Sequence, residues 1–94
     1  MKLRFTPNAV ADIDSVYDYI AADDPVAAQT VLLRIGQLVD QLPAHPMLGR
    51  KGRVDGTREL IVPNTPFIAV YEIEEPYLNI LAIIHTSRRW AEHF

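Results

Sequence analysis

The sequence contains no cysteine, only four glycines and only two lysines among its 94 residues. The lack of cysteine excludes disulfide bonds, thiolate metal sites and cysteine nucleophiles, and it suits a reducing compartment. The chain also contains no glycine-rich phosphate loop and no nucleophile elbow. No apolar run approaches the roughly 18 residues of a membrane span, and the first residues do not resemble a signal peptide. We therefore expect a cytoplasmic protein that does not associate with membranes.

The apolar content that is present suffices for one hydrophobic core. Hydrophobic residues make up 49% of the chain, and a chain of 94 residues is too short for two domains. We therefore expect residues 1–94 to form a single domain. The net charge of -3 is unevenly distributed, because residues 1–49 carry three basic and six acidic side chains whereas residues 50–94 carry six of each. An anionic partner should accordingly contact the second half of the chain.

Two amphipathic helices are predicted after a short strand at residues 2–5. Thr6-Pro7 and Asp24-Pro25 each place a capping side chain directly before a proline at the first helical position. Apolar residues then recur at three- and four-residue spacing, and the second apolar stripe continues to Leu42. Pro43 stops this helix. Because the turn between the two helices is short, the helices should lie antiparallel.

The second half of the sequence predicts three strands at about residues 57–62, 66–74 and 77–85. Their short connections force an antiparallel meander. Residues 43–56, rich in proline, glycine and basic side chains, are predicted to form a mobile, positively charged loop. Residues 67–70 and 80–84 are apolar on both faces, so the sheet should be covered on both sides. The second cover is the chain's own C-terminus, a dimer partner or a bound protein segment. The fold class is α+β, with a helical hairpin on a small, mainly antiparallel sheet in the order β-α-α-β-β-β.

Five segments in this order and spacing resemble the RelE/ParE superfamily of toxins from bacterial type II toxin–antitoxin modules. They are Thr6–Ile13, Pro43–Arg50, Thr57–Leu60, Thr65–Tyr71 and Ile80–Trp90. The resemblance covers essentially the whole chain. It implies a small toxin that arrests growth, is neutralised by a cognate antitoxin in a hetero-oligomer and needs no cofactor.

The superfamily has two branches, and the residues for each can be named. RelE-like members cleave messenger RNA on the ribosome, whereas ParE-like members poison DNA gyrase and perform no hydrolysis. RNA cleavage without a metal needs a base, an acid and cations for the phosphorane charge. If this chain is a ribonuclease, Trp90 or Tyr71 would stack on a base, and the catalytic residues would be Arg58, His85, Arg88 and Arg89.

The resemblance favours the gyrase branch. The ribonuclease branch places an arginine at the position matched by Ile68, and it carries lysines near Glu59 and Ile61. The gyrase branch commonly ends its last strand in a pattern similar to Ile83-Ile84-His85. An acidic chain is also poorly suited to ribosomal RNA, since each neutralised phosphate contributes affinity. We expect the target to contact Arg50, Lys51, Arg53, Arg58, Arg88, Arg89 and Trp90, and we predict no antitoxin-binding residues.

Less specific interpretations of the same residues stay open. His85 ends an apolar strand and is equally compatible with a structural role. Arg58 and Glu59 are compatible with a surface ion pair that contributes little. Asp12, Asp14 and Asp18 are interpreted as a solvated helix face, and no metal site is predicted. A third functional hypothesis is an inactive toxin-like protein that only binds the antitoxin within a repressor complex.

Overall fold

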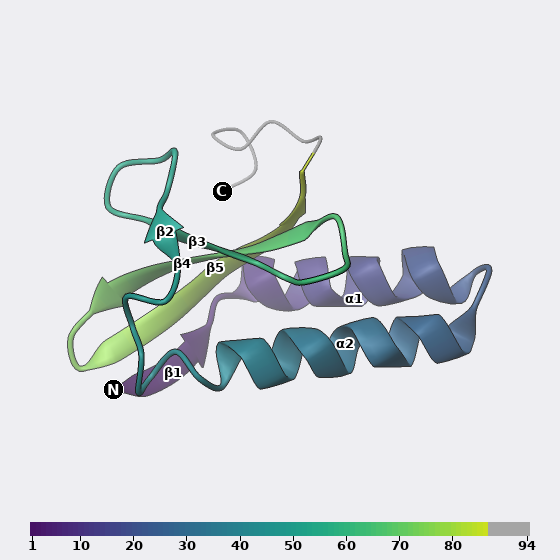
Figure 1. Cartoon of the computed structure of the whole chain (residues 1–94), viewed down its shortest axis with the longest axis horizontal. Helices are drawn as coiled ribbons and strands as arrows, with labels where there is room; N and C mark the ends of the chain where they lie inside the picture. Colours follow the sequence, from purple (N-terminus) through teal and green to yellow (C-terminus); the bar gives the residue numbers. More distant parts are fainter. Residues whose placement is uncertain (87–94) are drawn as a thin grey trace.

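The computed structural model describes residues 1–86, which form two helices and one five-stranded sheet. The two helices lie side by side on one face of the sheet (Figure 1). This arrangement confirms the predicted α+β class. None of the helices in residues 1–86 is long and apolar enough to cross a membrane. In chain order the elements are β1 (Lys2–Phe5), α1 (Pro7–Ala21), α2 (Pro25–Val39), β2 (Arg50–Lys51), β3 (Arg58–Ile61), β4 (Phe67–Glu74) and β5 (Tyr77–His85).

Both helices begin at the predicted capping residues. The Thr6 hydroxyl accepts a hydrogen bond from the amide of Ala9 at 3.1 Å, and the Asp24 carboxylate accepts one from the amide of Ala27 at 3.1 Å. Helix α2 ends at Val39, before the apolar stripe is complete. Proline disfavours helical backbone in the residue before it, which for Pro43 is Leu42. Leu42 is nevertheless completely buried and enters the core from the turn that follows α2.

The sheet has the strand order β1-β5-β4-β3-β2. Strands β3, β4 and β5 form the predicted antiparallel meander. Strand β1 pairs in parallel with β5, with Leu3 opposite Leu78. The short strand β2 pairs antiparallel with β3 at the other edge. The predicted loop over residues 43–56 is therefore wrong at Arg50 and Lys51, because a strand of two residues has no alternating pattern to detect.

Strands β4 and β5 are buried on both faces, as their continuous apolar sequences predict. The main core lies between the helices and the sheet, and completely buried members include Val39, Tyr71 and Ile80. A second apolar cluster occupies the opposite face of the sheet, and none of its members is more than 2% exposed. We call this face the outer sheet face. Its cluster consists of Ile68, Val70, Ala82 and Ile84.

Candidate functional site

The described basic residues proposed to contact a target all lie on β2, on the loop after it and at the start of β3. The register places Arg50 opposite Glu59 and Lys51 opposite Arg58. The Arg50 guanidinium forms an ion pair with Glu59 at 3.1 Å, and the Arg53 amide donates to the other Glu59 oxygen at 2.8 Å. The Glu59 side chain is only 1% exposed. This buried carboxylate therefore fastens β2 and its loop to the sheet.

The glutamate that follows Arg58 in the sequence does not pair with Arg58. The ion pair suggested for Arg58 and Glu59 instead joins Glu59 to Arg50. Neighbouring residues in a strand point to opposite faces, so Glu59 and Arg58 face away from each other. The Arg58 guanidinium donates through Nη1 to the carbonyl of Gly49 at 2.7 Å.

A buried tyrosine holds the loop that precedes β2. The Tyr71 hydroxyl donates to the carbonyl of Pro46 at 2.7 Å and accepts from the amide of Gly49 at 2.8 Å. A side chain at position 49 would overlap the Tyr71 ring edge, so this close approach requires glycine. Burial raises the pKa of the Tyr71 phenol above its ordinary value of 10.0, and the Gly49 hydrogen bond and the Arg58 charge offset only part of that rise. The hypothesis that Tyr71 stacks on a base is wrong, because the side chain is completely buried.

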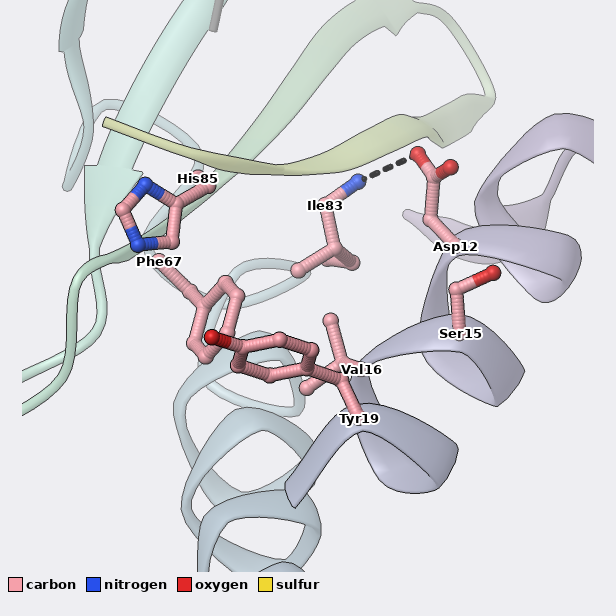
Figure 2. Close-up of a pocket in the computed structure, with 7 residues that line it drawn as sticks. All are labelled: Asp12, Ser15, Val16, Tyr19, Phe67, Ile83 and His85. Atoms are coloured by element: carbon pink, nitrogen blue, oxygen red, sulfur yellow. Dashed lines mark hydrogen bonds between the residues drawn. The ribbon is translucent and has the colours of Figure 1, made fainter. Parts of the chain in front are cut away.

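His85 lies at a second site, where the end of β5 meets α1. Its ring packs against the Phe67 ring in a T-shaped arrangement with centroids 5.6 Å apart. Figure 2 shows His85 and Asp12 on opposite sides of a hollow of about 490 Å³. The Asp12 carboxylate accepts a hydrogen bond from the amide of Ile83 at 3.0 Å. The hollow is lined by Asp12, Ser15, Val16, Tyr19, Phe67, Ile83 and His85.

The fold does not bring Arg58 and His85 together. Arg58 is opposite Tyr71 in the middle of β4, whereas His85 is opposite Phe67 at the start of β4. At about 3.3 Å per residue and about 4.8 Å between strands, their backbones are separated by roughly 13 Å along the sheet and about 10 Å across it. Arg88, Arg89 and Trp90, which were predicted to join either site, lie outside the described residues.

Sequence reasoning missed three side chains that organise these sites, namely Glu59, Tyr71 and Asp12. Glu59 was interpreted as a surface group, and the sequence does not reveal that it lies opposite the buried Val70 of β4. Tyr71 offered a weak signal, since a tyrosine inside an apolar strand usually needs a partner for its hydroxyl. Asp12 was assigned to a solvated helix face, yet it accepts the Ile83 amide at the part of β5 that extends beyond β1.

Comparison with known proteins defines the class to which this chain belongs. A family model described as the ParE toxin of the type II toxin–antitoxin system parDE matches residues 3–90. A putative toxin, Y4kP of Sinorhizobium fredii, is 38% identical over 91 residues, which are 97% of this chain and 94% of that protein. Toxin RelE2 of Caulobacter vibrioides is 31% identical over 84 residues, which are 89% of this chain and 93% of that protein.

A solved structure supports the same assignment. A chain of the chromosomal ParDE toxin–antitoxin system from P. aeruginosa is 32% identical and superposes with a TM-score of 0.80, covering 90% of this chain and 95% of that chain. The fold is thus that of a toxin of a type II toxin–antitoxin system. The chain belongs to the ParE toxin family, within the RelE/ParE superfamily.

Proposed function

We propose that this toxin arrests growth by inhibiting DNA gyrase, without hydrolysing RNA, and that a cognate antitoxin neutralises it. The observation that carries the proposal is the chemistry of the outer sheet face. The positions at which the ribonuclease branch carries an arginine and lysines correspond to Ile68, Glu59 and Ile61. All three lie on the outer sheet face, where Ile68 is 2% exposed and belongs to the apolar cluster.

A ribonuclease of this superfamily needs positive charge on the outer sheet face, and the described residues supply little of it. The cleavage transition state places negative charge on phosphate oxygens, which must be met by cations. Here Arg50 already neutralises the buried carboxylate of Glu59, and Arg4, near the opposite edge of this face, is paired with Glu74. The separation of Arg58 from His85 is a second argument against a joint acid–base and phosphate site. The proposal of an antitoxin partner is supported by the solved structure of a chromosomal ParDE toxin–antitoxin system, one chain of which this fold matches.

The decisive experiment is induced expression of the full-length chain in cells without the antitoxin. We expect growth arrest with intact transcripts, relief of the arrest by the antitoxin gene, and loss of supercoiling activity when purified gyrase is incubated with the purified toxin. Ribosome-dependent cleavage of transcripts with unaffected gyrase would overturn the proposal in favour of the ribonuclease, a result that the relative named RelE2 makes worth testing. Absence of arrest by a folded chain would favour the inactive antitoxin-binding protein.

A matched variant separates the two active hypotheses. His85→Gln keeps a side chain capable of hydrogen bonding but cannot transfer a proton near neutral pH. We expect this variant to arrest growth as the parent does, provided that its circular dichroism spectrum and unfolding midpoint match those of the parent. A folded His85→Gln chain that no longer arrests growth would point to acid–base catalysis.

A further inference from the structure

Lys51 and Arg58 face each other across β2 and β3, and neither forms an ion pair with an acidic residue in the described part of the chain. Residues directly opposite in an antiparallel pair lie on the same face with Cβ atoms about 5 Å apart, so these two like charges repel. The adjacent pair differs, because Arg50 and Glu59 neutralise each other on the outer sheet face. Of the ion pairs formed within residues 1–86, none includes Lys51 or Arg58. The Lys51–Arg58 pair therefore destabilises this hairpin unless an anion binds to it.

A hydrogen bond holds the Arg58 guanidinium in place, and within residues 1–86 its other donors are not used. Its Nη1 donates to the carbonyl of Gly49 at 2.7 Å in a partly buried position. Within residues 1–86, its remaining donors make no further hydrogen bond. A guanidinium presents several donors in a planar fork that matches the two oxygens of a carboxylate. Arg58 is thus oriented by the fold while keeping donors for a ligand.

A hollow of about 330 Å³ lies against this pair of cations. The backbone of its rim is closed by a hydrogen bond from the amide of Gly52 to the carbonyl of Thr57 at 2.8 Å. A side chain at position 52 would overlap the Thr57 hydroxyl, and Gly56 adopts a φ of 80°, so both glycines are needed for this tight loop. A loop fixed in this way loses little entropy when a ligand binds. The hollow is lined by Lys51, Gly52, Asp55, Gly56, Thr57, Arg58 and Ile73.

We propose that this hollow binds the carboxylate of an aspartate or glutamate side chain from a partner protein. Lys51, Arg58 and Asp55 give the lining a formal charge of +1, which one carboxylate neutralises. Ile73 supplies an apolar wall for the methylene carbons of the incoming side chain. A nucleic-acid backbone, in contrast, brings a row of phosphates to a chain whose net charge is -3. This inference deepens the proposed function, and it depends on that function only for the existence of a protein partner.

The test measures binding directly, with the full-length chain labelled with nitrogen-15 and a short acidic peptide, acetyl-Gly-Asp-Glu-Asp-Gly-amide, as the probe. We expect saturable changes in the NMR chemical shifts of the backbone amides within residues 51–58. The double variant Lys51→Gln/Arg58→Gln should raise the dissociation constant about tenfold or more, because hydrogen bonds to charged groups are lost. Arg34→Gln removes a basic residue from the exposed surface of α2 and should leave the affinity unchanged.

Two further titrations identify the ligand chemistry. Inorganic phosphate and a short single-stranded DNA replace the peptide, and tighter binding of either at residues 51–58 would overturn the carboxylate assignment. A peptide titration without shifts in these residues would overturn the site itself. These results do not depend on growth arrest or on gyrase, so the site and the proposed function can fail separately.

A stability measurement separates loss of binding from loss of folding in these variants. Lys51→Gln alone leaves the hydrogen bond between Arg58 and Gly49 in place and removes the repulsion across β2 and β3. Its thermal unfolding midpoint should equal or exceed that of the parent. A lower midpoint would show that Lys51 supports the fold and would contradict its role as a binding group.

Discussion

A single hydroxyl group on Tyr71 connects the middle of the sheet to the loop that leads into β2. Its two hydrogen bonds satisfy the carbonyl of Pro46 and the amide of Gly49. The Tyr71 side chain is completely buried, and so is its bond with the Gly49 amide, so water cannot easily replace that bond. The loop position, and with it the carbonyl that orients Arg58, therefore depends on this one oxygen atom.

Tyr71→Phe should lower the free energy of unfolding by about 1–3 kcal/mol, because the buried Gly49 amide and the partly buried Pro46 carbonyl lose their partner. Urea denaturation followed by circular dichroism measures this change. Tyr19→Phe is the matched control, since the Tyr19 side chain is 77% exposed and should tolerate the same substitution. Equal midpoints for the parent and Tyr71→Phe would mean that the loop does not need the hydroxyl.

The same tyrosine makes stability sensitive to alkaline pH. Burial raises the pKa of Tyr71 in the folded state above 10.0, so the folded chain retains this proton at pH values where the unfolded chain has lost it. The contribution of this proton to the free energy of unfolding is fully present below the pKa of Tyr71 in the unfolded state. It declines as pH rises above about 10. The parent should therefore lose more stability than Tyr71→Phe across this window. Parallel losses in both proteins would assign the effect to other groups.

At the scale of elements, strand β2 depends on the buried carboxylate of Glu59. A strand of two residues gains little from backbone pairing alone. Glu59 adds charge-assisted hydrogen bonds to the Arg50 side chain and to the Arg53 amide. These bonds hold the hairpin in the geometry that places Lys51 opposite Arg58.

Glu59→Gln should reduce stability by about 1–3 kcal/mol and accelerate hydrogen exchange at the Arg53 amide, since the neutral amide is a weaker acceptor. Glu74→Gln is the control, because Glu74 pairs with Arg4 while both side chains are largely exposed. Such an exposed pair contributes at most about 1 kcal/mol. If both variants lose the same stability, burial of the Glu59 carboxylate does not matter.

For the whole molecule, the surface of the helical hairpin carries large apolar side chains. Tyr19, Val26 and Leu33 are 77%, 73% and 65% exposed. Groups of exposed apolar side chains often mark surfaces that bind other proteins. We therefore expect the purified chain to self-associate and expect the co-expressed antitoxin to raise its solubility.

Leu33→Lys should reduce self-association, as measured by sedimentation velocity. Gln37→Lys adds the same charge at an exposed polar position of α2 and should have a smaller effect. A parent chain that stays monomeric at high concentration would contradict the expectation.

The sequence by itself determined the helices, the antiparallel meander and the toxin superfamily. These features rest on local signals, such as the Thr6 cap, the spacing of apolar residues and the short turns between strands. Tertiary structure alone decided that Glu59 pairs with Arg50 rather than with its neighbour Arg58, and that Arg58 lies beside the middle of β4 while His85 lies beside its start. Register and strand order bring together residues distant in sequence, and a linear pattern carries no record of which charges will then face each other.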